Sequence, residues 1–338
     1  MSDTKPVRAS EQLDWERLGA YLRDALPELH GELRVEQFPG GHSNLTYLIG
    51  IGETALVLRR PPFGPVPPRA HDMAREYRVL AAVHPHFPLA PKPYLLCEDT
   101  SVIGSVFYVM ERRNGVVIRT KEPPEMTPEL RARISESAVD TLVELHAVAP
   151  VPIGKPEGFV ARQVHGWTER WHGSKTSEVP EMESLAGWLA SRVPADPAAP
   201  SIVHGDFKLD NVMLDAGDLS RIVGVFDWEM SALGDPLVDL GILLCYWVHV
   251  ASAGHEAVST VTARPGWFGR EEILRRYADR SHRDVANISF YEVFALFKLA
   301  VVVQQIFARY HRGQTDDPRF ATLDQQVAML ARKAAELT

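Results

Sequence analysis

The sequence pattern changes near residue 114, and this change constrains the fold more than any other feature of the chain. From about Leu33 to Glu111, short runs of β-branched and aromatic residues alternate with Gly, Pro or polar pairs, a pattern typical of strands. Within this part, residues 71–84 carry apolar side chains at helical spacing. We therefore predict a small lobe over residues 1–112, with strands at 33–38, 45–51, 54–60 and 105–112 and helices at about 10–26 and 71–84.

The sequence after Asn114 favours helices. A helix is expected to begin with Thr127 as its N-cap and Pro128 at its first position, and to run to about residue 148. Further helices are expected at about 180–193, 236–250, 269–281, 287–312 and 318–337. The predicted fold class is α+β, with a small antiparallel β lobe followed by a larger, mainly helical lobe over residues 113–338.

The composition is that of a globular protein, with 338 residues, 45% hydrophobic and 24% charged. The net charge of −8 argues against a nucleic-acid partner, because such proteins usually carry a basic surface. Cys97 and Cys245 are far apart in apolar surroundings, which favours reduced thiols in a core. The first 18 residues lack an apolar targeting segment, and no run is long and charge-free enough to span a bilayer. We expect a cytoplasmic protein without a membrane partner, of unspecified oligomeric state.

A glycine-containing loop, PGGHSN, lies between the first two predicted strands. Gly41 can bring backbone N–H groups close to an anion, and Ser43 and Asn44 add donors. Gly-Gly between two strands is also common in ordinary hairpin turns, so the loop alone is weak evidence for an anion site.

The strand at residues 54–60 ends in two arginines. Period-2 alternation places Arg59 on the same face as Ala55 and Val57, where a cation could reach a phosphate. A solvent-facing charge at a strand end is the simpler alternative for a single Arg. Glu76, in the middle of the next helix, either pairs with Arg59 or is an exposed helical acid.

The stretches VHGDFKLDN and RIVGVFDWEM carry the strongest functional signal. Asp206 and Asn211 lie on one loop between apolar runs, and Asp227 ends the apolar strand that follows. Asn and Asp oxygens suit Mg²⁺, and a separate acid can orient and deprotonate an attacking hydroxyl. Each residue alone could simply cap a turn. The ordered set, with His204, favours phosphoryl transfer, which depends on positioning and charge neutralisation.

With these motifs the chain resembles the aminoglycoside phosphotransferase family, small-molecule kinases with a protein-kinase-like fold. The resemblance spans roughly Phe38 to Phe320 and rests on VHGDFKLDN and on VFDWEMSALGDPLVDLG. It implies that Asp206 is the catalytic base and that Asn211 and Asp227 are Mg²⁺ ligands.

The resemblance also implies roles for residues around these motifs. His204 would brace the catalytic loop, Asp235 and Asp239 would hold the segment that follows, and Glu229 would support a second metal. The nucleotide, ATP or GTP, would contact the backbone of Glu111 and Arg112, with Met110 packed behind it. Its phosphates would contact Gly41, Ser43, Asn44 and Arg59, with Glu76 paired to the arginine.

Two departures from the family pattern concern the phosphate site. Kinases usually carry Lys where this chain has Arg59. An arginine cannot act as a compact point charge, but its planar fork can hold phosphate oxygens bidentately. The loop PGGHSN also lacks a full Gly-x-Gly-x-x-Gly pattern, so its phosphate contacts would involve the backbone near Gly41–Asn44.

The acceptor is expected to be anionic. Residues 161–175 hold three Lys or Arg against one acidic residue, and residues 264–283 hold six Arg against three, in a chain that is acidic overall. The stretches VLRRPP, REYRVL and GQTDDPRF are similar to kinase domains associated with acyl-CoA dehydrogenases, which implies a hydroxyacyl-CoA acceptor.

Three alternatives remain. The first is an aminoglycoside kinase that confers resistance, which should carry an acid-rich acceptor pocket. The second is a catalytically impaired nucleotide-binding protein, suggested by Arg59. The third, a protein kinase, is disfavoured because only WEMSALG separates Asp227 from the Asp-Pro pair, which leaves little room for a peptide platform.

Overall fold

The computed structural model describes residues 3–39, 44–64, 71–251 and 261–338. The chain forms two compact units. The sheet unit comprises Met1–Asn114 together with Val223–Glu229, and the helical unit comprises Gly115–Ile222 and Met230–Thr338. The predicted phosphate contacts Gly41 and Ser43 lie outside the described residues.

The sheet unit is built on five antiparallel strands in the order β1-β2-β3-β5-β4. The strands are β1 (Leu33–Gln37), β2 (Leu45–Ile51), β3 (Thr54–Arg60), β4 (Pro93–Cys97) and β5 (Phe107–Glu111). β2 buries every second side chain, from Leu45 to Ile51, as expected for a strand with one face on a core. That core also takes up Leu18 and Leu22 of α1 (Trp15–Ala25).

The second helix of the sheet unit, α2 (Met73–Val83), packs against β4 and β5. Asp72 caps it by accepting a hydrogen bond from the backbone N–H of Arg75 at 2.9 Å. The segment Val223–Glu229 is anchored to the same unit. Its Trp228 is buried edge-on against Phe87, and the N–H of Val225 donates to the carbonyl of Leu89 at 2.9 Å.

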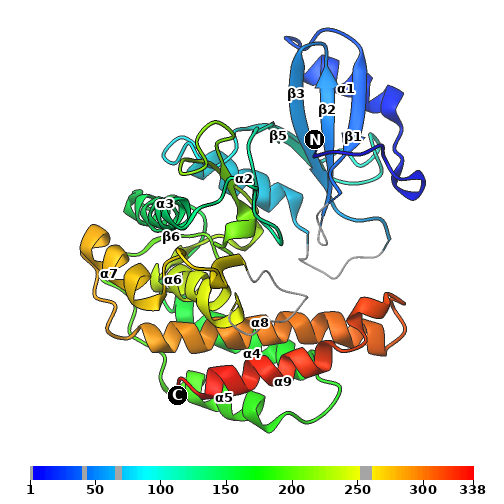
Figure 1. Cartoon of the computed structure of the whole chain (residues 1–338). Helices are drawn as coiled ribbons and strands as arrows, with labels where there is room; N and C mark the ends of the chain where they lie inside the picture. Colours follow the sequence, from blue (N-terminus) through cyan, green and yellow to red (C-terminus); the bar gives the residue numbers. More distant parts are fainter. Residues whose placement is uncertain (1–2, 40–43, 65–70, 252–260) are drawn as a thin grey trace. The chain divides into compact units, whose positions relative to one another are not determined.

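The helical unit contains α3 (Pro128–Ala147), α4 (Phe159–Ser174), α5 (Pro180–Ser191), α6 (Leu237–Leu244), α7 (Arg270–Ser281), α8 (Ile288–His311) and α9 (Leu323–Ala335). α6 continues as a π-helical stretch, Cys245–Val250. α8 is the central helix and contacts α4, α5, α6 and α9, and Figure 1 shows it (orange) alongside α9 (red). Thr127 caps α3 by accepting from the N–H of Leu130, as predicted.

Short strands bracket the predicted catalytic loop. β6 (Ser201–Val203) pairs antiparallel with β9 (Ala232–Gly234), and β7 (Val212–Leu214) follows the loop. β8 (Ile222–Val225) contains the boundary between the two units. The predicted α+β class is confirmed, with a strand-rich part followed by a mainly helical part.

Four features differ from the sequence-based expectation. β4, α4 and β9 were not predicted, and the helix expected at 318–337 is a short 3₁₀ turn, Pro318–Phe320, followed by α9. In β4, Pro93 and a register shift between Pro93 and Leu95 interrupt the strand pattern. In α4, Gly166 and Gly173 weaken the helical signal.

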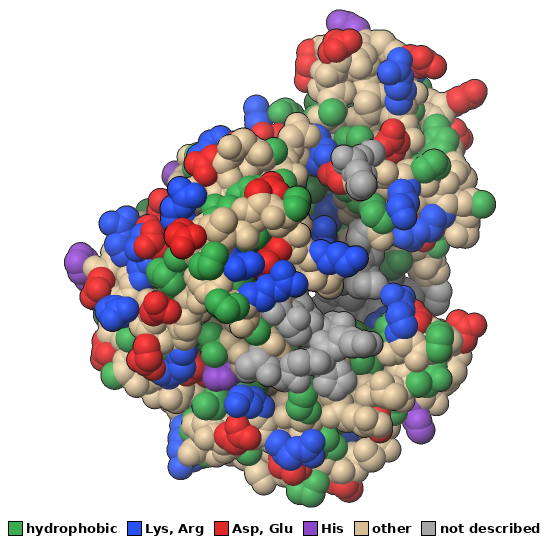
Figure 2. All heavy atoms as spheres, in the orientation of Figure 1, with side chains coloured by type: hydrophobic (Ala, Val, Ile, Leu, Met, Phe, Trp, Pro, Cys, Tyr) green, Lys and Arg blue, Asp and Glu red, His purple; other side chains and the backbone are tan. Residues whose placement is uncertain are grey.

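Among the described residues, α8 is the one helix long and apolar enough to cross a membrane, but 72% of its apolar window is buried in the fold, as in a core helix. Figure 2 shows acidic and basic side chains interspersed over the visible face of the described residues. Neither observation favours a membrane span or a broad basic surface.

Candidate active site

The loop that follows β6 is held rigidly at its first three residues. His204 is fully buried, and its Nδ1 atom accepts a hydrogen bond from the N–H of Asp206 at 3.2 Å. Gly205 has φ of +82°, and a Cβ at this position would lie 2.7 Å from the carbonyl oxygen of Met230. Only glycine meets both conditions, so the loop sequence fixes the direction in which Asp206 leaves the strand.

The buried carboxylate of Asp239 on α6 holds this loop by its backbone. It accepts hydrogen bonds from the N–H groups of His204 (2.6 Å) and Gly205 (2.7 Å), and His146 of α3 lies 3.2 Å away. Burial alone raises the pKa of Asp239, but the hydrogen bond and charge of His146 offset this and the pKa falls below its usual value. Asp239 was expected to hold the segment after Asp227, which stays a prediction, and the structure shows that its carboxylate holds the backbone of His204 and Gly205.

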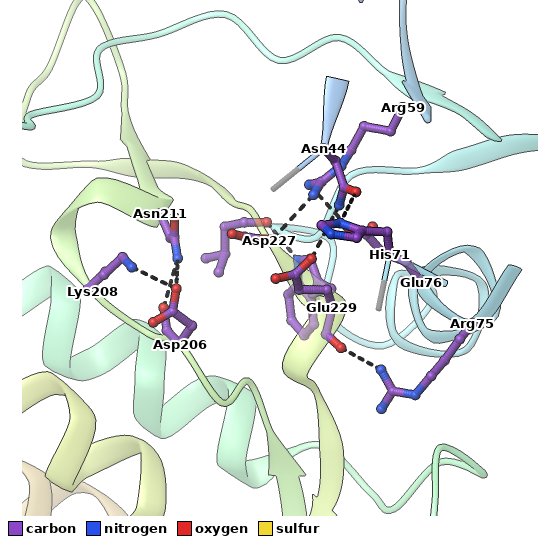
Figure 3. Close-up of polar contacts among 12 residues, drawn as sticks. Asn44, Arg59, His71, Arg75, Glu76, Asp206, Lys208, Asn211, Asp227 and Glu229 are labelled. Carbon is purple, nitrogen blue, oxygen red and sulfur yellow. Dashed lines mark hydrogen bonds and ion pairs between the residues drawn. The ribbon is translucent and has the colours of Figure 1, made fainter. Parts of the chain in front are cut away.

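Asp206 is surrounded by donors from its own loop (Figure 3). Lys208 Nζ lies 2.7 Å from Asp206 Oδ2, and the side-chain amide of Asn211 donates to the same oxygen at 3.0 Å and to the Asp206 carbonyl at 2.9 Å. Burial lowers the pKa of Lys208, but the nearby Tyr246 and Asp206 outweigh this effect and raise it. Lys208 therefore stays charged beside the carboxylate.

In the sheet unit, Arg59 bridges two carboxylates (Figure 3). Its guanidinium lies 3.1 Å from Glu76 Oε1 and 3.4 Å from Asp227 Oδ1. The open alternative for Glu76 is thereby resolved: it is buried and paired with Arg59. Burial lowers the pKa of Arg59, but the charges of Glu76, Asp227 and Glu229 raise it overall.

Asp227 lies two residues after the end of β8 in a left-handed conformation, with φ of +69°. This conformation is uncommon for residues other than glycine and is concentrated at functional sites. The Asp227 side chain is 33% exposed, whereas Glu76 is 2% exposed. Asp227 is thus the acid of this cluster that a ligand can reach.

A second network braces the residues after Asp227. The Asn44 amide donates to Glu229 Oε2 at 3.2 Å, its oxygen lies 2.8 Å from His71 Nδ1, and Arg75 donates to the Glu229 carbonyl at 2.6 Å. The buried Asn44 side chain is therefore engaged within the protein, and the predicted phosphate contact at this residue, which involves its backbone, stays a prediction.

The predicted nucleotide-base contacts lie at the end of β5. Met110 is buried, and the N–H of Glu111 donates to the carbonyl of Lys92 at 2.8 Å. The N–H of Glu111 is therefore engaged within the sheet unit, and the contact of the Glu111 and Arg112 backbone with a nucleotide base stays a prediction. The Arg112 side chain forms an ion pair with Asp3 at 2.6 Å.

The residues predicted to hold Mg²⁺ offer suitable atoms. The Asn211 amide nitrogen points at two oxygens of Asp206, which leaves the amide oxygen as its free acceptor. Asp227 offers a partly exposed carboxylate. Both are hard oxygen donors, as Mg²⁺ prefers. Among the described residues, no group of three or more His, Cys, Asp and Glu side chains could hold a metal, so Mg²⁺ would depend also on phosphate and water oxygens.

Of the six arginines counted over residues 264–283, four form ion pairs with acids outside this segment, and Arg275 and Arg283 form none with a described acid. Arg264 pairs with Glu122, Arg270 with Glu292, and Arg276 with Asp140, and each of these acids lies elsewhere in the sequence. The local count missed these partners. In residues 161–175, Lys175 likewise pairs with Glu183, and Arg162 donates to backbone carbonyls.

Sequence reasoning assigned no role to Lys208 and did not single out Lys298 of α8, which donates to the carbonyl of Gly205. Lys208 sits between Asp206 and Asn211, so its place inside the motif was a usable signal. A lysine within the apolar run ALFKLAVVV was the corresponding signal for Lys298.

The chain is similar to a known protein family and to curated relatives. A model described as the phosphotransferase enzyme family matches residues 34–284. Acyl-CoA dehydrogenase family member 11 of Mus musculus is 33% identical over 351 residues, covering 100% of this chain but only 45% of the mouse protein. The chain thus spans less than half the length of this relative.

Solved structures agree in fold. A protein from Ralstonia eutropha, provisionally named an aminoglycoside phosphotransferase, is 31% identical with a TM-score of 0.82, over 96% of this chain and 98% of that one. A thermostable aminoglycoside phosphotransferase variant bound to AMP-PNP and hygromycin B is 16% identical, with a TM-score of 0.59 over 94% of this chain and 98% of that one, and supports the fold alone.

The predicted resemblance is confirmed, including the similarity to acyl-CoA dehydrogenase relatives. The family match covers most of the chain, and the sheet and helical units have the order found in kinase-like structures. This chain belongs to the phosphotransferase enzyme family and is a small-molecule phosphotransferase with a kinase-like fold.

Proposed function

We propose that this chain transfers the γ-phosphoryl group of ATP, or of GTP, to a hydroxyl group of an anionic small molecule, with Asp206 as the base. The observation that carries the proposal is the geometry of the Asp206 loop. The carboxylate is 19% exposed, its backbone is fixed through Asp239, and Asn211 and Lys208 contact it directly. An acid held in this way can orient a hydroxyl and accept its proton during phosphoryl transfer.

The other predicted residues have complementary roles in this proposal. Asn211 and Asp227 would hold Mg²⁺, which neutralises phosphate charge when bound. Arg59, kept charged by Glu76, would hold phosphate oxygens with its fork. Lys208 offers a second cation beside the base. His204 acts through the loop backbone and does not contact the substrate.

An acceptor of the hydroxyacyl-CoA class is supported by the relatives. The mouse relative is named as an acyl-CoA dehydrogenase family member, and the match extends over this whole chain. A hydroxyacyl-CoA has both the hydroxyl group and the anionic charge that the proposal requires. The Ralstonia protein is named as an aminoglycoside phosphotransferase, which keeps an antibiotic acceptor as the second candidate.

An acceptor panel tests the proposal. We would incubate the protein with radiolabelled ATP or GTP, Mg²⁺, and either hydroxyacyl-CoA compounds or aminoglycosides, and follow label transfer to the acceptor. Asp206→Ala serves as the inactive variant, and Asp218→Asn, at an exposed turn acid, as the matched control. We expect transfer to a hydroxyacyl-CoA that falls about 10²- to 10⁴-fold in Asp206→Ala.

Each alternative has its own result. Transfer to aminoglycosides alone would establish the antibiotic-modifying function in place of the proposed one. Nucleotide binding without transfer to any acceptor would favour the impaired nucleotide-binding protein.

A further inference from the structure

α8 carries one lysine in the middle of an apolar helix. Lys298 lies between the buried residues Phe297 and Leu299, and its ammonium donates to the carbonyl of Gly205, the residue before Asp206. Burial lowers the pKa of Lys298. Placing an ammonium in such surroundings costs free energy unless it is paired, so the position calls for a partner.

The described part of the chain does not supply that partner. No described carboxylate forms an ion pair with Lys298, although the charges of Asp206 and Asp239 offset part of the effect of burial on its pKa. An ammonium has three donors, and the Gly205 carbonyl accounts for one of them. Two donors beside the catalytic loop are thus left for a ligand.

A second cation contacts the same aromatic ring as Lys298. The Trp167 ring of α4 lies 5.5 Å from the Lys298 ammonium and 4.7 Å from the guanidinium carbon of Arg170. Arg170 is exposed and, unlike Lys175 on the same segment, makes no ion pair with a described acid. Two cations that contact one ring raise the positive potential around it, which favours an anion nearby.

We propose that Lys298 binds an anionic group of the acceptor, a carboxylate or a phosphate, and that Arg170 supports it across the Trp167 ring. This inference rests on the proposed function and names the residues that select the acceptor. Lys298 touches the loop one residue before Asp206, so an anion bound to it places the remainder of the acceptor next to the base. In this proposal the residues that select the acceptor lie on α4 and α8.

Calorimetric titration tests the proposal without requiring turnover. The probes are 3-hydroxybutyrate, which carries a carboxylate, coenzyme A, which carries phosphates, and 1,3-butanediol as the uncharged counterpart of the first. Lys298→Met removes the charge at similar length, and Lys298→Arg keeps it. Arg309→Gln, an exposed cation on the same helix, is the matched control.

We expect at least one anionic probe to bind about 10- to 100-fold more weakly to Lys298→Met, the loss of one charged hydrogen bond. Lys298→Arg and Arg309→Gln should retain affinity within about threefold, Arg170→Gln should show an intermediate loss, and the diol should not respond. Whether carboxylate or phosphate is recognised follows from which probe loses affinity.

A purely structural role for Lys298 gives a different pattern. If Lys298→Met lowers kcat for a panel acceptor but leaves KM and the affinity for both anions unchanged, the lysine only tethers Gly205 and the proposal is wrong. Failure of both anions to bind the wild-type protein would also overturn it. The titration measures binding alone, so it decides the role of Lys298 even if no acceptor is phosphorylated. A lack of phosphorylation would count against the proposed function and not against the role of Lys298.

Discussion

Replacing Asp239 should lower both the stability of the helical unit and the activity that depends on the Asp206 loop, whereas replacing Asp235 should lower the stability alone. The buried carboxylate accepts hydrogen bonds from the N–H groups of His204 and Gly205 and lies 3.2 Å from His146. Asp239→Asn turns one of its oxygens into an NH₂ group. Whichever way the amide is oriented, that donor faces another donor at a buried site.

The magnitude follows from the contacts that are lost. Each hydrogen bond to a charged group contributes about 1.5–3 kcal/mol, and a buried donor left without an acceptor costs about 1–3 kcal/mol. With the two backbone N–H groups of His204 and Gly205 affected, we expect the free energy of unfolding to fall by about 3–5 kcal/mol. A displacement of Asp206 by about 1 Å should lower kcat by about 10²-fold.

Urea unfolding gives the stability, and phosphoryl transfer under conditions where the variant is folded gives kcat. Asp235→Asn is the matched control, because this buried acid accepts from Tyr291 at 2.5 Å and from Leu237 without contacting residues 204–206. It should lose stability while keeping kcat within about tenfold. A loss of less than about 1 kcal/mol in Asp239→Asn, or equal kcat losses in both variants, would refute the reasoning.

Two further predictions concern the helical unit. Burial raises the pKa of Glu122, but hydrogen bonds from Arg131, Trp267 and Arg264 more than offset this and lower it from 4.5 to about 2. This carboxylate therefore contributes stability above pH 4.5 that is lost as the pH falls towards 2. Glu122→Gln should lower the free energy of unfolding by about 2–3 kcal/mol at pH 7 and by progressively less in acid, as measured by urea unfolding across pH. A difference between the two proteins that is independent of pH would contradict this. Gly205→Ala should lower the free energy of unfolding by about 1–3 kcal/mol and remove most activity, because of the positive φ and the contact with the Met230 carbonyl. Gly187→Ala, in open space on α5, is the control and should be neutral or stabilising. Comparable losses in the two alanine variants would show that the left-handed conformation is not required.

The order of elements could be predicted because local patterns are strong in this chain. β2 alternates buried and partly buried residues along its length, and Thr127 and Pro128 mark the start of α3. α4 was missed because its interior glycines weaken the helical pattern, although Val160, Val164, Trp167 and Trp171 repeat at helical spacing and are all buried. β4 was missed because Pro93 begins it and a register shift interrupts it.

The candidate site was partly predictable for a different reason. Asp206 and Asn211 share one loop, so the motif placed them together, and the Arg59–Glu76 pairing was one of two stated alternatives. Partners distant in the sequence could not be derived. The local charge count over residues 264–283 could not include acids such as Glu122 and Asp140, which reach those arginines only through the tertiary fold, and the anionic acceptor that it favoured stays a prediction.

The central claim is that Asp206 acts in the transfer step and not in nucleotide binding. The most direct test measures ATP affinity in the presence of Mg²⁺ and turnover side by side, in wild-type protein and in Asp206→Ala. We predict an affinity within about threefold of wild type and a turnover lower by about 10²- to 10⁴-fold, because the base is used only as the hydroxyl attacks. Turnover close to that of the wild type in Asp206→Ala would contradict the assignment of the base.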